Sequence, residues 1–183
     1  DVLLTAKSIS VEEFMPDRIK VETKANKETV SPSENFTISG EALNLFGPPA
    51  TGRNYEMNFS LSKKYFSPKG LEAYNFELEG GGRDYFENTF AEGTTDENGR
   101  FSQTFTVPKN YSNNGLLEAK VYTTVFDETG RPVSRMSQVE VQTQDAMFGI
   151  QYFDRYVKAR EVIAIPVIAV NPQGQIFNQK KAK

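Results

Sequence analysis

Hydrophobic and polar residues alternate with a period of two along most of this chain. The alternation is clearest in the segments Tyr55 to Leu61, Leu117 to Val125, Phe36 to Gly40, Phe101 to Val107 and Val133 to Val141. A period of two is typical of antiparallel strands that bury one face and expose the other. Each segment is therefore predicted to be a strand with one core-facing side.

Turn-forming residues separate these segments. The run Phe46-Gly47-Pro48-Pro49 ends one strand, and Thr95 to Arg100 leads into the strand at Phe101. Asp127 to Pro132 and Asn171 to Gln175 each join two strands as hairpins. The last three segments share an Asp or Asn three residues before a Gly, which fits a type I turn followed by a left-handed glycine.

The spacing of strands and turns predicts the fold class. Roughly seven strands follow one another at intervals of about 8 to 15 residues, without a convincing helix. This pattern indicates an all-β fold, an antiparallel β-sandwich of fibronectin III or immunoglobulin type. Residues 63–92 are the least regular part of the chain and include Gly80-Gly81-Gly82, so they are predicted to be a long insertion between strands.

Two breaks in the strand pattern suggest domain boundaries. Pro16 interrupts an extended segment near the start, and a second break falls at Gln144-Asp145. We expect residues 1–15 to be the end of a preceding domain or a leading strand, and residues 16–143 to be a complete sandwich. Residues 144–183 are predicted to be the first strands of an adjacent, incomplete sandwich, which would be marginally stable unless packed on a neighbour.

Composition narrows the possible functions. The chain of 183 residues has a net charge of −3 and a pI near 5.2, which favours neither nucleic acid nor anionic membranes as partners. It contains no Cys and no His, which excludes disulfides, thiol catalysis and His-dependent triads or metal sites within it. The longest apolar run, Val162 to Val170, holds Pro166 and is too short for a membrane helix.

The remaining candidates for chemistry are weak. Asp96-Glu97-Asn98-Gly99 resembles part of a calcium loop, but its Gly is misplaced and the twelfth position is Val107 rather than Glu. Gly80 to Gly82 follows no phosphate-binding pattern. We expect no catalytic residue, no cofactor site and no metal ligand in this chain, and an enzyme is the least favoured function class.

Aromatic pairs flank the insertion: Tyr65-Phe66 and Tyr85-Phe86. Exposed, they would form a binding patch; buried, they would fix the insertion to the sheet, and large aromatic side chains favour burial. A β-sandwich binding or adhesion module that recognises a glycan or a protein through the 63–92 insertion is therefore the alternative function.

Motifs along the chain carry a resemblance to a known family. They are VEEFMPDRIKV from Val11, ALNLFGPPATG from Ala42, EGTTDENGRFSQTFTVP from Glu92, VFDETGRPVSR from Val125 and IQYFDRYVKAREVIAIPVIAVNPQGQ from Ile150. In this order and spacing, the chain resembles bacterial α2-macroglobulins, large multidomain endopeptidase inhibitors of the cell envelope. The complete domain is similar to the fifth macroglobulin-type domain, and the tail to the start of the sixth.

The resemblance implies a structural part in a conformational trap. In the family, a protease cuts a bait segment, the domains rearrange and enclose the protease, and in many members a Cys-Gln thioester attaches to it. Neither bait nor thioester is visible in this chain. The implied partners are neighbouring macroglobulin domains of the same chain and, through the full-length protein, target proteases.

The resemblance also carries expectations about place and movement. It implies a periplasmic, cell-envelope or extracellular location, and leaves open whether the parent carries a lipid anchor. Pro16 and Asp145 would mark hinges between rigid modules. Independently of the resemblance, the alternation from Tyr55 to Leu61 predicts that Phe59 lies at the centre of the sandwich core.

Overall fold

The computed structural model describes residues 17–77, 85–152, 156, 160 and 162–177. The described chain is built from strands and one short 3-10 helix, η1 (Lys109–Tyr111). The strands are β1 (Ile19–Ala25), β2 (Thr29–Val30), β3 (Asn35–Asn44), β4 (Asn54–Lys63), β5 (Tyr74–Asn75), β6 (Tyr85–Thr94), β7 (Arg100–Thr106), β8 (Leu116–Phe126), β9 (Pro132–Gln142), β10 (Met147–Gln151) and β11 (Val167–Val170). Within these ranges no helix has the length and apolar character that a membrane crossing requires.

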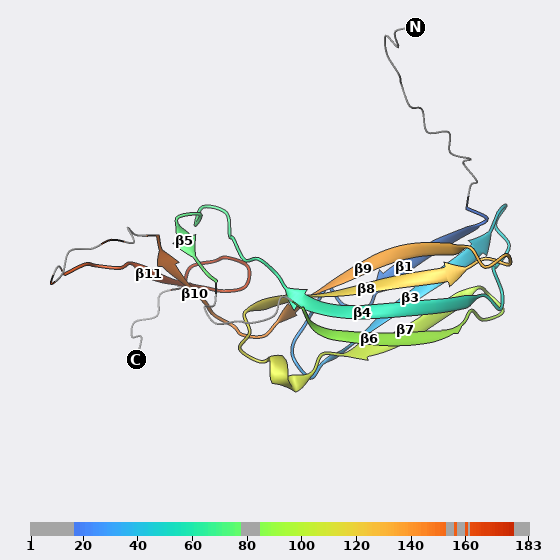
Figure 1. Ribbon diagram of the computed structural model, residues 1–183, viewed down its shortest axis with the longest axis horizontal. Coiled ribbons are helices and arrows are strands. Elements are labelled where there is room, and N and C mark those ends of the chain that lie inside the picture. The colour runs from blue at the N-terminus through green and yellow to red at the C-terminus, as the bar shows by residue number, and fades with distance from the viewer. Residues whose placement is uncertain (1–16, 78–84, 153–155, 157–159, 161, 178–183) are drawn as a thin grey trace, which may run out of the picture.

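Two sheets form a β-sandwich, seen as the long body on the right of Figure 1. One sheet has the order β1-β3-β7 and the other the order β2-β9-β8-β4-β6. All pairings are antiparallel except that of β2 with β9, in which Thr29 faces Glu140 and Val30 faces Val141. This arrangement confirms the predicted antiparallel sandwich of fibronectin III or immunoglobulin type.

The core lies between the two sheets and follows the predicted faces. Aromatic rings occupy its centre: the ring centroids of Phe36 and Phe59 are 5.7 Å apart, and Phe105 lies 5.8 Å from Phe36 and 5.4 Å from Phe59. Phe59 is 1% exposed, as predicted. On β8, the neighbour of β4 in the same sheet, the alternate residues from Leu117 to Val125 are all buried. Each buried ring contributes a large apolar area to folding.

The three predicted Asp/Asn-x-x-Gly turns are present. In each, the glycine has a positive φ, 74° at Gly99, 82° at Gly130 and 80° at Gly174, and its N–H donates to the carbonyl of the Asp or Asn three residues earlier. The carboxylate or amide oxygen of that residue also accepts backbone N–H groups within the turn. The turn chemistry read from the sequence is therefore confirmed at all three places.

The predicted extent of the insertion is wrong at its C-terminal end. Residues 85–94, counted mostly within the irregular 63–92 segment, form strand β6 and pair with β4 along its length. Small residues of β6, Thr89, Ala91 and Gly93, lie opposite the large residues Phe59, Met57 and Tyr55 of β4. A Cβ atom at Gly93 would lie 2.6 Å from the Tyr55 hydroxyl. Strand β6 therefore lacks the apolar alternation that marks the other strands.

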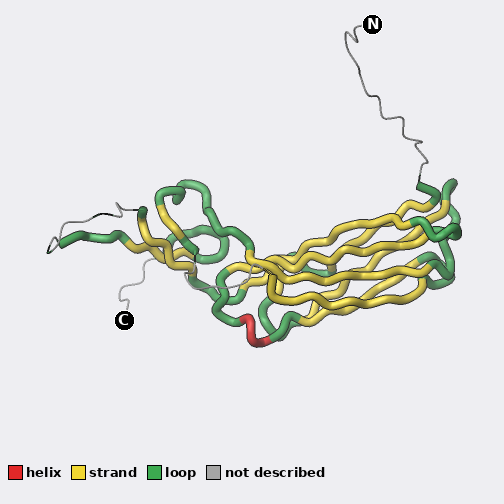
Figure 2. The backbone as a smooth tube through the Cα atoms, in the orientation of Figure 1, coloured by secondary structure: helices red, strands yellow, loops and turns green. Residues whose placement is uncertain are grey.

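A small third sheet lies beyond the end of the sandwich, at the left of Figures 1 and 2. Its order is β11-β10-β5, so the tail strands pair with a strand of the insertion. Strand β11 is shorter than predicted: Val162 to Ile165 are exposed and outside strands, and pairing starts after Pro166, which has no N–H to donate. The division into domains at 16, 143 and 144 stays a prediction, and Pro16 with residues 1–15 lies outside the described residues.

Candidate functional site

The insertion and the tail meet at the end of the sandwich, in what we call the junction: residues 64–77, 114–116 and 143–151. Strand β5 pairs with β10 through Ile150 opposite Asn75 and Gln151 opposite Tyr74. The Tyr152 N–H extends this contact by donating to the Ala73 carbonyl at 2.9 Å. The insertion therefore becomes the third strand of the small sheet.

An apolar cluster holds the junction together. Leu116 at the start of β8, Met147 of β10 and Val170 of β11 are buried, and side chains from the insertion pack against them. Phe66 and Phe76 meet edge to face, with ring centroids 5.2 Å apart. Gly149 lies directly under this pair, because a Cβ atom there would be 2.6 Å from the Phe76 ring. The cluster is separate from the main core and joins residues far apart in sequence.

The connection between β9 and β10 is anchored at its first residue. The Thr143 hydroxyl donates to the Gly115 carbonyl at 2.7 Å and accepts from the Asn114 N–H at 2.8 Å. The Gln144 side-chain amide donates to the Ala146 carbonyl at 2.8 Å, whereas Asp145 is exposed. The backbone bends at Asp145, the predicted hinge position, and the hinge itself stays a prediction.

One ion pair connects the first residue after β4 with the end of β9. The Lys64 ammonium lies 2.5 Å from the Glu140 carboxylate, which also accepts from the Gln142 amide at 2.9 Å. Burial raises the pKa of Glu140, but the hydrogen bonds from Gln142 and Lys64 and the charge of Lys64 outweigh it and leave the pKa below its usual value. Glu140 therefore stays ionised and tied to Lys64 near neutral pH.

The junction surrounds a cavity of about 400 Å³. Its walls are aromatic and apolar side chains of the cluster together with Lys63, Lys64, Glu77, Asn114 and Gln144. No group of three or more carboxylates that could hold a metal ion occurs among the described residues. The arrangement packs the insertion and the tail against the end of the sandwich.

The aromatic residues singled out in the sequence separate in the structure. Phe66 packs in the junction as predicted, but Tyr65 is 70% exposed, so the prediction of burial is wrong for Tyr65. Neighbouring residues of a strand-like segment point to opposite sides, and only one of the two can face the cluster. The side chains of Tyr85 and Phe86 lie outside the described part. Sequence reasoning missed Leu71 and Phe76, which stand in no regular pattern.

The carboxylate of Asp96, in the segment that resembles part of a calcium loop, forms hydrogen bonds within its own turn. The Asp96 Oδ1 atom accepts the N–H groups of Asn98 at 2.9 Å and Arg100 at 2.7 Å. Asp127 does the same in its hairpin, where the Thr129 hydroxyl hydrogen bond is the main cause of its lowered pKa. These carboxylates stabilise turns.

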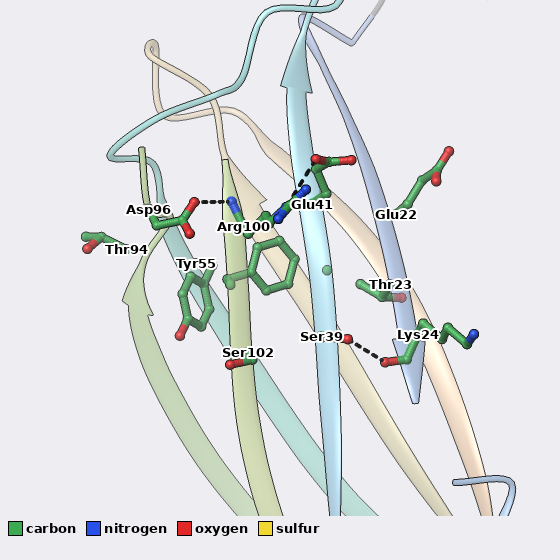
Figure 3. A pocket seen from close by; sticks show the side chains of 12 residues that line it. Glu22, Thr23, Lys24, Ser39, Glu41, Tyr55, Thr94, Asp96, Arg100 and Ser102 are labelled. Carbon is green, nitrogen blue, oxygen red and sulfur yellow. Dashed lines mark hydrogen bonds and ion pairs between the residues drawn. The ribbon is translucent and has the colours of Figure 1, made fainter. Parts of the chain in front are cut away.

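A second, open hollow of about 910 Å³ lies over the β1-β3-β7 sheet and its edge toward β6 (Figure 3). Two of its carboxylates form ion pairs. Glu41 lies 3.6 Å from the Arg100 guanidinium, and Glu22 lies 2.6 Å from the ammonium of Lys20 beside the hollow, whose hydrogen bond lowers the pKa of Glu22. The hollow therefore presents a polar surface with charges of both signs.

The two packed sheets define an immunoglobulin-like β-sandwich module with a small third sheet at one end. Residues 17–142 match the family model described as the bacterial α2-macroglobulin MG5 domain. Because the match covers more than half of the chain, the chain belongs to this family. The resemblance seen in the sequence motifs is thereby confirmed.

Curated relatives are α2-macroglobulins of other bacteria. The chain is 29% identical over 181 residues to the α2-macroglobulin homolog of Yersinia pestis, covering 93% of this chain and 9% of that protein. It is 22% identical over 149 residues to α2-macroglobulin of Xylella fastidiosa, covering 79% of this chain and again 9% of the relative. The chain thus spans about a tenth of the length of these relatives.

Solved structures agree on the fold. Trypsin-activated α2-macroglobulin from Escherichia coli matches with a TM-score of 0.68 at 18% identity, over 88% of this chain and 12% of that one. Salmonella α2-macroglobulin reacted with methylamine matches with a TM-score of 0.67 at 19% identity, over 90% of this chain and 12% of that one.

Proposed function

We propose that this chain is a structural module of a bacterial α2-macroglobulin-type endopeptidase inhibitor and has no catalytic role itself. The observation that carries the proposal is the MG5 match over residues 17–142. The E. coli protein matches this chain both in its native conformation and after activation by trypsin or porcine elastase. A scaffold module retained through activation predicts this likeness. Neighbouring macroglobulin domains are its direct partners, and proteases are partners of the whole protein.

The junction supports a mechanical role within that scaffold. Residues 144–146 lie between a connection anchored at Thr143 and a tail clamped by strand β5. A few residues at the end of an element commonly absorb the backbone change when two rigid bodies reorient. We therefore assign the bend between the sandwich and the next unit to this segment, in a protein of the bacterial periplasm or cell envelope.

The alternative of a binding module receives less support. Its proposed surface, the insertion, is engaged within the chain, because β5 pairs with β10 and Phe66 and Phe76 pack in the junction. Among the described aromatic residues of the original set, Tyr65 alone faces solvent.

The test compares the full-length parent with the isolated chain. Each is mixed with trypsin, and cleavage of a large protein substrate and of a small chromogenic peptide is followed. We expect the full-length protein to protect the protein substrate while peptide cleavage continues, and the isolated chain to protect neither. Inhibition or hydrolysis by the isolated chain would overturn the scaffold assignment.

A pair of adjacent variants tests the junction. In the full-length parent, Phe66→Ala removes a ring from the junction cluster, whereas Tyr65→Ala removes an exposed ring beside it. We expect Phe66→Ala to weaken protection of the protein substrate and Tyr65→Ala to leave it unchanged. Equal effects, or specific glycan-array binding abolished by Tyr65→Ala, would favour the binding-module alternative.

A further inference from the structure

The outer face of the β9-β8-β4-β6 sheet carries a row of exposed apolar side chains. Met136 lies opposite Tyr122, Tyr122 opposite Asn58, and Asn58 opposite Phe90, so the row crosses four strands in register. Met136, Tyr122 and Phe90 are 47%, 49% and 56% exposed. With strands spaced at about 4.8 Å, the row is roughly 14 Å long. Single exposed apolar residues are ordinary, but an aligned row marks an interaction surface.

The opposite outer face of the sandwich has no such row. Apart from Leu43, which lies opposite Lys20 at the end of β3, these described outward positions of β1, β3 and β7 are polar or charged: Lys20, Glu22, Lys24, Thr37, Ser39, Glu41, Ser102 and Thr104. Several of these side chains surround the hollow in Figure 3. The apolar row is therefore a property of one face of the sandwich.

Beside the row stands a pair of like charges. Glu56 of β4 lies directly opposite Glu92 of β6, and both are exposed. Like charges in directly opposite positions destabilise a sheet. None of the ion pairs among the described residues involves Glu56 or Glu92, although Glu118 and Glu140 on the same face have Lys120 and Lys64 within 2.9 Å and 2.5 Å.

In the other sheet, a comparable pair of opposite carboxylates is neutralised by nearby cations. Glu22 lies opposite Glu41, but each has a cation of its own, Lys20 at 2.6 Å and Arg100 at 3.6 Å. The Glu56–Glu92 pair instead lines an open hollow of about 840 Å³. The other charged groups of that hollow are engaged, since Arg53 pairs with Glu128 at 3.2 Å and Asp127 is held in its turn.

We propose that this outer face docks another domain of the same parent protein, one that places an apolar side chain on the row and Lys or Arg on Glu56 and Glu92. The inference rests on the proposed function. Glu56 precedes Asn58 by two residues of one strand, so the basic group lies about 7 Å along β4 from the middle of the row. The relatives supply such a partner in principle, because this chain is 9% of their length.

Charge distinguishes this occupant from others. A second copy docking through the same face would bring further uncompensated carboxylates toward Glu56 and Glu92. An anionic lipid surface would be repelled in the same way. A partner domain with basic side chains beside an apolar centre would neutralise the repulsion between Glu56 and Glu92 and would also cover the apolar row.

The experiment places a photo-crosslinking benzoylphenylalanine at Tyr122 in the full-length parent, with the same probe at Ser39 on the opposite face as the control. We expect the Tyr122 probe to form an intramolecular cross-link to one segment outside this chain, with Lys or Arg beside the linked residue, and the Ser39 probe to form none there. A Tyr122 cross-link to a second copy or to lipid, or a yield no higher than that of the control, overturns the proposal.

Charge reversal provides the second measurement. Glu56→Lys combined with Glu92→Lys is expected to lower the Tyr122 cross-link yield by about fivefold or more. Glu97→Lys, at an exposed turn position, is expected to leave it unchanged. An undiminished yield in the double variant contradicts the charge argument. Protease protection is measured in parallel: protection without the cross-link refutes the docking surface alone, whereas loss of protection in the unmodified parent refutes the proposed function.

Discussion

The buried hydroxyl of Thr123 leads to a sharp prediction about stability. Thr123 is fully buried in strand β8 between Val121 and Val125, and its Oγ1 atom has no hydrogen-bond partner in the described structure. Thr123→Val replaces that hydroxyl with a methyl group of nearly the same size. The substitution therefore removes an unpaired polar group while leaving the packing volume almost unchanged.

The magnitude follows from the cost of an unpaired polar group. Leaving a buried donor or acceptor without a partner costs about 1 to 3 kcal/mol. We expect Thr123→Val to raise the free energy of unfolding by about 1 to 2 kcal/mol, which for a chain of this size raises Tm by about 2 to 4 °C per kcal/mol. Urea denaturation of the 183-residue chain measures it as a higher midpoint at an unchanged m-value.

Two matched variants isolate the hydroxyl. Thr123→Ser keeps the hydroxyl and removes the methyl group, so it is expected to cost about 1 kcal/mol. Thr124→Val changes the next residue, whose exposed hydroxyl lies 2.8 Å from that of Ser134, and is expected to stay within about 0.5 kcal/mol of the wild type. A Thr123→Val protein no more stable than the wild type would refute the reasoning, because it would mean that the hydroxyl is hydrogen-bonded in solution.

Further predictions concern the core, the turns and pH. Phe59→Ala should lower the free energy of unfolding by about 3 to 5 kcal/mol in urea, since Phe59 is 1% exposed; a loss below about 1 kcal/mol would contradict its central place. Gly130→Ala should cost about 1 to 2 kcal/mol for its left-handed backbone, and Gly99→Ala more, because its Cβ would lie 2.3 Å from the Ala42 carbonyl oxygen; thermal melts showing the reverse order would argue against the turn geometry. Folding lowers the pKa of Glu140, so its contribution is present above the usual value of 4.5 and is lost as pH falls through the folded-state pKa. The stability difference between wild type and Glu140→Gln should therefore shrink in urea titrations below about pH 4.5, and a pH-independent difference would exclude this linkage.

The sandwich could be predicted from the sequence because its strands and turns depend on residues that are close together in the chain. Phe59 and Val121 face each other across β4 and β8, and each belongs to an uninterrupted alternation of apolar and polar residues. Gly99 and Gly130 stand three residues after an Asp that accepts the turn N–H groups, a spacing visible in the sequence. In both cases a few neighbouring residues determine the geometry.

Strand β6 shows where such reasoning fails. Ala91 and Gly93 are small and lie opposite Met57 and Tyr55, so at these positions the apolar signal sits on the partner strand. Phe90 departs further from the expected alternation, because this apolar side chain stands at an outward position of β6 and is 56% exposed. A strand that contributes small residues to the core shows no apolar periodicity from which it could be predicted.

The junction could not be predicted for a different reason. The β5–β10 pairing joins Asn75 to Ile150 through a strand of only two residues, too short to show a period. Phe76 and Gly149 fit each other, but neither is unusual by itself. Such complementarity depends on two segments that are far apart in sequence, so the sequence of either segment alone does not reveal it.

The pairing of β5 with β10 also determines how the joint can move. The chain leaves the sandwich after Lys63 and again after Gln142, so two described segments connect the sandwich with the small sheet. A single connecting segment would let the small sheet rotate freely about the axis of that segment. Two segments fixed at separate points, one by the Lys64–Glu140 pair and one at Thr143, would resist twisting and permit bending about one line. A rotation of the small sheet would then reach the sandwich as a tilt in a defined direction.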